Sequence, residues 1–274
     1  MKLDVIVLDL RFRAEDVIEF PPGRAANILR GTLGKALYGA AWYERFFAPR
    51  RADGPSGWKD PPRPFVLRVS HLDGARIEPG RLFSVRLNVF LAEACDFLVR
   101  AVERAGLEGW GPGRGKARLV RHVRTPVEVS LAPAGREVSR VRVRFLTPTE
   151  LKIDGGLAAQ PDFGILFARL RDRVSTLRAV YGAGPLDLEF ASLGDRASRV
   201  RMVSCNVRQE FRRRHSSHTG QTHPLAGFTG EAAYEGSLSE FMPFLHAGYW
   251  TGVGRQTVWG HGQMEAFEEA PVTS

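Results

Sequence analysis

The chain has 274 residues, of which 43% are hydrophobic, so it can form one large domain or two small ones with a packed core. It contains no run of about 18 apolar residues that would span a membrane, and its first residues are too charged for a signal peptide. Two cysteines, Cys95 and Cys205, are too few for a disulfide framework. These features predict a protein of the reducing cytoplasm without a membrane partner.

Basic residues outnumber acidic ones by 39 to 30, giving a net charge of +9, and most of them are arginine. They are clustered: residues 111–124 hold five Lys and Arg with no acid, and residues 196–214 hold seven arginines with one acid. Arginine pairs with phosphate through two parallel hydrogen bonds and stacks on bases, so this clustering indicates nucleic-acid binding. The alternative is a solubilising surface, for which lysines interspersed with glutamates would be expected.

The first half of the chain predicts two helices, from apolar residues three or four apart, and four strands, from alternation. The expected elements are a strand over 1–15, a helix over 24–47, strands over 64–72 and 81–91, a helix over 91–105 that stops at Gly106, and a strand over 117–126. The order is β-α-β-β-α-β, with a glycine-rich segment before the last strand.

The second half repeats this order. The expected elements are a strand over 139–148, a helix from Pro161 to Tyr181 ended by Gly182, strands over 199–211 and 227–235, a short helix after a Ser237–Glu240 capping box, and a final strand after the glycines. Pro243 indicates that the short helix starts late or is kinked.

Two ferredoxin-like domains in tandem explain this repetition better than one irregular fold. The sequence therefore predicts an α+β protein made of two β-α-β-β-α-β domains. The N-terminal domain is expected over residues 1–126, a linker over Val127–Val138, and the C-terminal domain over 138–274.

The C-terminal glycine-rich segment contains Gly252, Gly254, Gly260 and Gly262, with Arg255 between the two pairs. A dinucleotide-binding fingerprint would open a helix inside a βαβ unit, and no such helix or P-loop follows here, so no nucleotide cofactor is expected. Instead the glycines are expected to bring backbone N–H groups to a polynucleotide phosphate, with Arg255 adding charge. The alternative is that they only let the loop fold flat between helix and strand.

The chain as a whole resembles the RAMP superfamily of CRISPR systems. More narrowly, its C-terminal half resembles the CRISPR-associated endoribonuclease that processes precursor CRISPR RNA at its repeats. The segments that carry the resemblance are 22–37, 147–156, 225–236, 241–245 and 248–263. The resemblance implies CRISPR repeat RNA as the partner. It also implies cleavage without metal or other cofactor, in which an RNA 2′-hydroxyl attacks the adjacent phosphate and leaves a cyclic phosphate and a 5′-hydroxyl.

Such a reaction requires a base near the 2′-oxygen, a cation near the phosphorane and an acid for the leaving oxygen. In much of the family a histidine in or just after the first helix takes part, whereas this chain has no histidine before His71. That departure supports an alternative: a non-catalytic RAMP subunit that holds CRISPR RNA beside other effector subunits.

Lys35 and Tyr38 lie one turn apart in the place of that histidine. Lys35 is expected to stabilise the phosphorane or act as the acid, and Tyr38 to position the 2′-hydroxyl. Arg30 and Lys152 are expected to contact RNA. The alternative is that Lys35 and Tyr38 are ordinary surface residues.

A second catalytic candidate is the segment 211–224, which is expected to be a loop. Its His215 and His218 are candidate bases, since nearby positive charges favour the neutral imidazole. Arg212, Arg213 and Arg214 are expected to bind RNA phosphates. No zinc site is expected, because the histidine spacing has no nearby cysteine or acid. The alternative is an RNA-contacting loop without a catalytic role.

Overall fold

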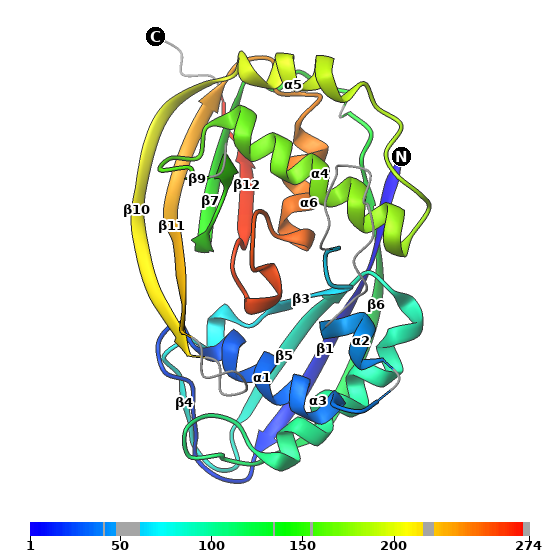
Figure 1. Ribbon diagram of the computed structural model, residues 1–274, viewed down its shortest axis with the longest axis vertical. Coiled ribbons are helices and arrows are strands. Elements are labelled where there is room, and N and C mark those ends of the chain that lie inside the picture. The colour runs from blue at the N-terminus through cyan, green and yellow to red at the C-terminus, as the bar shows by residue number, and fades with distance from the viewer. Residues whose placement is uncertain (41, 48–60, 134, 154–155, 216–221, 271–274) are drawn as a thin grey trace.

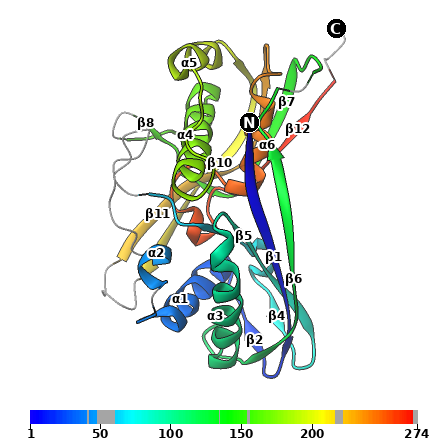
Figure 2. The same ribbon diagram turned by 90° about the vertical axis from the view of Figure 1, so that its right-hand side faces the viewer.

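The structure, a computed structural model, describes residues 1–40, 42–47, 61–133, 135–153, 156–215 and 222–270, with side chains described outside 211–225. Within these ranges each half of the chain forms an antiparallel four-stranded sheet, with its main helices against one face (Figure 1, Figure 2).

The N-terminal sheet has the strand order β3-β5-β1-β6. Its strands are β1 (Lys2–Ala14), β3 (Phe65–Arg68), β5 (Leu82–Val89) and β6 (Ala117–Ser130), and its helices are α1 (Ala25–Leu37) and α3 (Cys95–Glu108). The short elements of this half are β2 (Ile18–Glu19), α2 (Tyr43–Phe47), η1 (Ser70–Leu72), β4 (Arg76–Ile77) and η2 (Ala92–Ala94).

The C-terminal sheet has the order β10-β11-β7-β12. Its strands are β7 (Arg140–Thr149), β10 (Arg201–His215), β11 (Thr222–Glu235) and β12 (Met264–Glu268), and its helices are α4 (Phe163–Tyr181), α5 (Phe190–Ser198) and α6 (Met242–Thr251). The short elements are β8 (Lys152–Ile153), β9 (Gly156–Leu157) and η3 (Thr257–Trp259). In both sheets the first and third strands of the β-α-β-β-α-β order lie at the centre, which confirms the predicted tandem ferredoxin-like fold.

Local chemistry explains the helix boundaries. Asp162 caps α4, because its Oδ1 accepts hydrogen bonds from the N–H groups of Gly164 at 3.0 Å and Ile165 at 3.3 Å. The predicted end of the other long helix at Gly106 is wrong: α3 continues to Glu108 and ends at Gly109, whose φ is 96°. Gly106 is needed inside the helix, since a Cβ there would lie 2.8 Å from the carbonyl oxygen of Ala117.

Four further expectations differ from the structure. The helix predicted over 24–47 ends at Leu37, because Tyr38 leaves the helical conformation with a ψ of 129°, and the separate helix α2 begins at Tyr43. Strand β6 continues to Ser130, four residues into the predicted linker, because β1 extends far enough to pair with it. The segment predicted as a histidine loop begins and ends as paired strand, since β10 reaches His215 and β11 starts at Thr222. The predicted capping box is not formed; α6 begins at Met242 with Pro243 in its first turn, so the helix does start late.

The two domains share part of their packing. Leu3 and Val5 of β1 belong to the hydrophobic core of the C-terminal half, whereas Leu8 and Leu10 of the same strand belong to the N-terminal core. Hydrogen bonds also cross the boundary: Asn88 Nδ2 donates to the carbonyl oxygen of Trp250 at 2.9 Å. The halves are therefore packed against each other through buried contacts.

Candidate nucleic-acid interface

The glycine-rich loop, residues 252–263, connects α6 to β12 and contains the turn η3. Gly252, Gly254, Gly260 and Gly262 have φ values of 65°, 75°, 77° and 67°, in the left-handed region that favours glycine. Close packing also requires glycine at two of these positions. A Cβ on Gly254 would overlap the carbonyl oxygen of Glu150, and one on Gly262 would overlap that of Val253.

The N–H groups of this loop are largely used inside the protein. Gly252 donates to the carbonyl oxygen of Gly248 at 2.9 Å, Gly260 to that of Thr257 at 3.0 Å, and Gly262 to that of Pro148 at 3.0 Å. These three N–H groups are thus occupied in this structure. The geometry fits the flat-folding role of the glycines, and their contact with RNA stays a prediction.

Arg255, the charged residue of the loop, is held by a buried carboxylate. Its Nη1 lies 2.6 Å from Oε1 of Glu150, which is only 4% exposed, and its backbone N–H donates to the carbonyl oxygen of Glu150 at 3.1 Å. Gln256 Nε2 donates to the second carboxylate oxygen at 3.3 Å. The Arg255 side chain is still 61% exposed, so Arg255 both anchors the loop and presents a charge to solvent.

Glu150→Gln is expected to lower the free energy of unfolding by about 1–2 kcal/mol, because a buried acceptor loses its charge while Arg255 rehydrates. Chemical denaturation measures this, with Glu240→Gln as the control, since Glu240 pairs with Arg196 at the surface. If Arg255 binds phosphate, the same change should also strengthen RNA binding. Equal stability losses in the two variants would contradict the anchoring role of Glu150.

Arg30 lies on α1 and points at the loop. Its guanidinium carbon lies 3.3 Å from the centre of the Trp259 ring and 5.1 Å from that of Phe47. This cation–π contact brings a predicted RNA-binding residue together with the glycine-rich loop. Ala26, one turn earlier, abuts Gly260. Lys152, in β8, is exposed and follows directly on the Glu150–Leu151 segment that packs under Gly254.

Lys35 and Tyr38 lie at the other end of α1. Twelve residues separate Ala26 from Tyr38, or roughly 18 Å of helix at 1.5 Å per residue. Both side chains are accessible: Lys35 is 66% exposed, and Tyr38, at 71%, packs edge-on against Tyr43. Both catalytic candidates therefore lie at the C-terminal end of α1, away from the glycine-rich loop.

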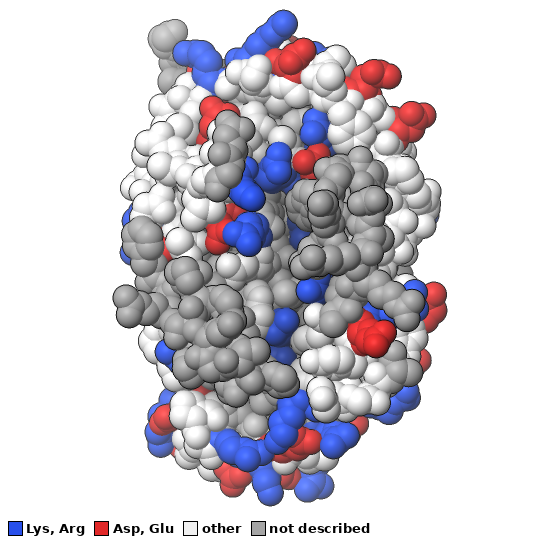
Figure 3. Space-filling view, viewed as in Figure 1, with Lys and Arg blue, Asp and Glu red and all other residues white. Residues whose placement is uncertain are grey.

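The surroundings of Lys35 are basic. Its Nζ lies 3.6 Å from a carboxylate oxygen of Glu108, Arg104 Nε lies 3.0 Å from the other oxygen, and Arg114 donates to the main-chain oxygen of Glu108 at 3.3 Å. One acid is therefore surrounded by three cations. At the lower end of the face drawn in Figure 3, which belongs to the N-terminal half, several Lys and Arg side chains lie among Asp and Glu side chains. The excess of positive charge around Glu108 suits a polyanionic ligand.

The histidine candidates are less defined. His215 is the last residue of β10 and pairs with Thr222, and Arg212, Arg213 and Arg214 precede it in the same strand. Their side chains, and His218 altogether, lie outside the described residues. Their roles therefore stay predictions.

A groove that the sequence did not reveal lies between α1 and the C-terminal sheet. It encloses about 250 Å³ and is lined by Ala26, Asp73, Arg208, Glu210, Gly260 and His261, among others. Arg208 and Glu210 both hydrogen-bond the hydroxyl of Thr229, at 3.2 and 2.7 Å. The sequence could have indicated that Arg208 and Glu210 lie together, since residues two apart in a predicted strand share one face.

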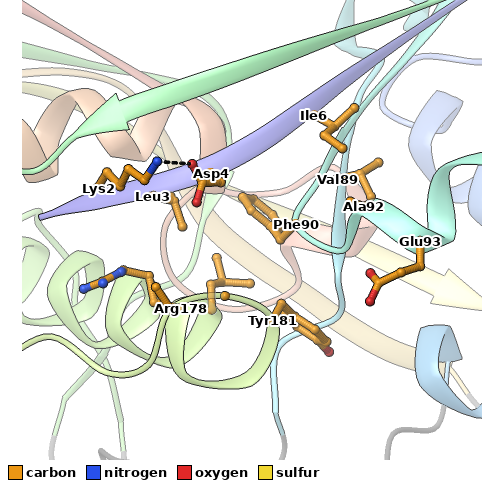
Figure 4. A pocket seen from close by; sticks show the side chains of 13 residues that line it. Lys2, Leu3, Asp4, Ile6, Val89, Phe90, Ala92, Glu93, Arg178 and Tyr181 are labelled. Atoms are coloured by element: carbon orange, nitrogen blue, oxygen red, sulfur yellow. Dashed lines mark ion pairs between the residues drawn. The ribbon is translucent and has the colours of Figure 1, made fainter.

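A second hollow, of about 320 Å³, lies where the start of β1 faces the end of α4. Figure 4 shows Phe90 and Tyr181 among its lining side chains, with the Lys2–Asp4 ion pair at its edge. Arg178 and Glu93 also line it, so charges of both signs are present. This mixture does not favour an anionic ligand.

Residues 143–264 match the family model of the CRISPR-associated endoribonuclease Cas6, and residues 3–141 match the model AF_1859_N, which describes an N-terminal domain. The C-terminal half of the chain belongs to the Cas6 family of CRISPR-associated endoribonucleases. The resemblance seen in the sequence is thereby confirmed, together with its implication of an endoribonuclease family that processes CRISPR RNA. None of the curated proteins matches the chain in sequence.

Solved structures of Cas6 proteins share the fold. The product complex of Thermus thermophilus Cas6 TTHB231 has a TM-score of 0.60 at 22% identity, over 96% of this chain and 99% of that one. The product complex of Cas6 TTHA0078 has a TM-score of 0.58 at 18% identity, over 96% and 100%. A Cas6-related protein from Pyrococcus furiosus has a TM-score of 0.50 at 14% identity, over 97% and 100%.

Among the described residues, no helix is long and apolar enough to cross a membrane. In the same part of the chain, no three His, Cys, Asp or Glu side chains are grouped so that they could hold a metal ion.

Proposed function

We propose that this protein cleaves precursor CRISPR RNA within its repeats by metal-independent attack of a 2′-hydroxyl on the adjacent phosphate. The observation that carries the proposal is the exposed Lys35 and Tyr38 pair at the end of α1, in a chain whose C-terminal half belongs to the Cas6 family. Lys35 supplies a cation or acid at the phosphorane, and Tyr38 hydrogen-bonds the 2′-hydroxyl. The products carry a 2′,3′-cyclic phosphate and a 5′-hydroxyl.

Basic residues from both domains support the proposal. Arg30, Lys152 and Arg255 provide charge along and beside the glycine-rich loop, and the strand that ends at His215 adds Arg212, Arg213 and Arg214. His215 and His218 are the candidates for the base. Two Cas6 relatives were solved as product complexes, which supports CRISPR RNA as the partner. A relative solved as part of a Cas6-RT-Cas1–Cas2 complex supports CRISPR proteins as further partners.

A non-catalytic RNA-holding subunit is the second candidate. It is favoured by the ion pair between Lys35 and Glu108 and by the lack of a histidine before His71. In that case the same surfaces bind repeat RNA and no bond is broken.

Cleavage in EDTA separates the candidates. Purified protein is incubated with its own repeat RNA in excess EDTA, and the fragments are analysed for their ends. We expect a single cut that leaves a cyclic phosphate, because no step needs a divalent ion. Tight binding without a cut would establish the RNA-holding role, and cleavage abolished by EDTA but restored by Mg²⁺ would overturn the metal-independent mechanism.

A further inference from the structure

The glycine-rich loop touches the N-terminal domain at three separate places. Gly260 abuts Ala26 so closely that a Cβ on Gly260 would overlap the Ala26 methyl group. The Trp259 ring lies against the Arg30 guanidinium, 3.3 Å from its carbon. Gln263, only 2% exposed, hydrogen-bonds Leu67 in β3 and Ser70 in η1 of the N-terminal domain. All three contacts come from a stretch of five residues.

The contacts of Gln263 are directional. Its Nε2 donates to the carbonyl oxygen of Leu67 in β3 at 3.1 Å, and its Oε1 accepts from the hydroxyl of Ser70 in η1 at 3.2 Å. A buried amide with both ends satisfied fixes orientation as well as distance. The loop therefore contacts both α1 and the β3–η1 junction of the N-terminal domain.

The loop is itself rigidly part of the C-terminal domain. Gln263 N–H donates to the hydroxyl of Thr147 at 2.9 Å, Gly262 N–H to the carbonyl oxygen of Pro148, and Arg255 N–H to that of Glu150. These acceptors lie at the end of β7 or just beyond it. A displacement of the loop thus requires a displacement of the central strand's end.

We propose that the glycine-rich loop is an interdomain clamp that holds α1 in register with the C-terminal domain, with Trp259 and Gly260 as positioning residues. The clamp grips the first turns of α1, whereas Lys35 and Tyr38 lie at its last turn. Because a helix is stiff over this length, the clamp sets where that far end stands relative to RNA bound on the C-terminal domain. Only this last consequence rests on the proposed cleavage; the clamp itself does not.

The test uses a steric mismatch and its repair. Gly260→Ala adds a methyl group that collides with Ala26, and the double variant Gly260→Ala/Ala26→Gly removes the collision. Gly80→Ala is the matched control, since Gly80 has a similar φ of 81° but no atom within 4 Å of an added Cβ. Ala26→Gly alone controls for the loss of a helix-favouring residue.

Interdomain distance is measured by electron paramagnetic resonance between spin labels at Arg100→Cys and Ser192→Cys, both exposed, with the exposed Cys205 changed to Ser. We expect the distance distribution to shift or broaden in Gly260→Ala, to return in the double variant, and to stay unchanged in Gly80→Ala. Trp259→Leu, which adds no atoms, is expected to broaden it as well. Unchanged distributions in Gly260→Ala and Trp259→Leu would overturn the clamp.

The kinetic consequence is tested on repeat RNA in single-turnover reactions. A misplacement of about 1 Å costs up to about 100-fold in rate, so Gly260→Ala is expected to slow cleavage at least about tenfold. Affinity for a repeat RNA with a 2′-deoxy scissile nucleotide should change less than about threefold, and Ala26→Gly should restore the rate. An affinity loss without a rate loss would assign the loop to RNA binding and overturn this kinetic consequence, while the distance measurement decides the clamp. If the wild-type protein does not cleave, the proposed function fails, and the distance measurement still decides the clamp.

Discussion

Changing Gly262 to Ala is expected to lower the free energy of unfolding by about 2–5 kcal/mol, the largest single effect in the glycine-rich loop. Two costs combine at this position. Gly262 has a φ of 67°, and an added Cβ would overlap the backbone carbonyl oxygen of Val253. That oxygen cannot move aside, because it belongs to the main chain of the same folded loop.

Chemical denaturation of the Gly262→Ala variant measures the loss, and Gly184→Ala separates its two components. Gly184 has a φ of 91° and nothing within 4 Å of an added Cβ, so this control reports only the cost of the left-handed backbone, about 1–2 kcal/mol. A similar loss in both variants would show that the loop has room to spare at Gly262. That result would favour a phosphate-binding role for these glycines over a close-packing role.

Removing the Lys35 side chain is expected to slow RNA cleavage by about 100-fold, at the lower end of what one positioned proton-transfer group contributes. The ammonium group is exposed and lies 3.6 Å from a carboxylate oxygen of Glu108, so its loss costs little stability. Single-turnover cleavage with saturating enzyme measures the effect, since saturation removes any contribution from weakened binding. Tyr38→Phe tests the hydroxyl in the same assay, because the ring can keep its contact with Tyr43.

Arg104→Ala is the matched control for Lys35→Ala. Arg104 pairs with the same carboxylate, Glu108, and is as exposed as Lys35, at 67% against 66%. It therefore removes one positive charge from the same patch without touching α1. We expect its rate to stay within about threefold of wild type. Equal rate losses for the two variants would mean that Lys35 contributes general charge and no chemistry.

The repeated fold could be predicted because its strands and helices produce local patterns of apolar residues. Apolar alternation and helical spacing identified the strands and long helices of both halves, and Gly182 marked the end of α4 as expected. Gly106 misled because a glycine inside a helix and a glycine after one look alike in sequence; only the approach of Ala117 distinguishes them. The extension of β10 to His215 was missed because its arginines carry no apolar alternation, while its stability comes from backbone pairing with β11.

The candidate site was harder to predict from the sequence, because its contacts join distant parts of the chain. Sequence patterns singled out Arg30, Gly260 and Arg255, but not that Arg30 stacks on Trp259 or that Glu150 holds Arg255. Glu150 itself gave no signal: one acid after a strand resembles many others until its burial is known. Such pairings depend on tertiary folding, and one sequence without its structure does not encode them in any local period.

The buried side chains of β1 are shared between two cores, which affects how the protein unfolds. Leu3 and Val5 face one core and Leu8 and Leu10 face the other, so a single uninterrupted strand is a structural member of both. The boundary between the repeats in sequence is therefore not a boundary between units of folding. Cutting the chain there would strip the C-terminal core of apolar side chains supplied by the N-terminal domain. We therefore expect the two repeats to unfold together in one cooperative transition.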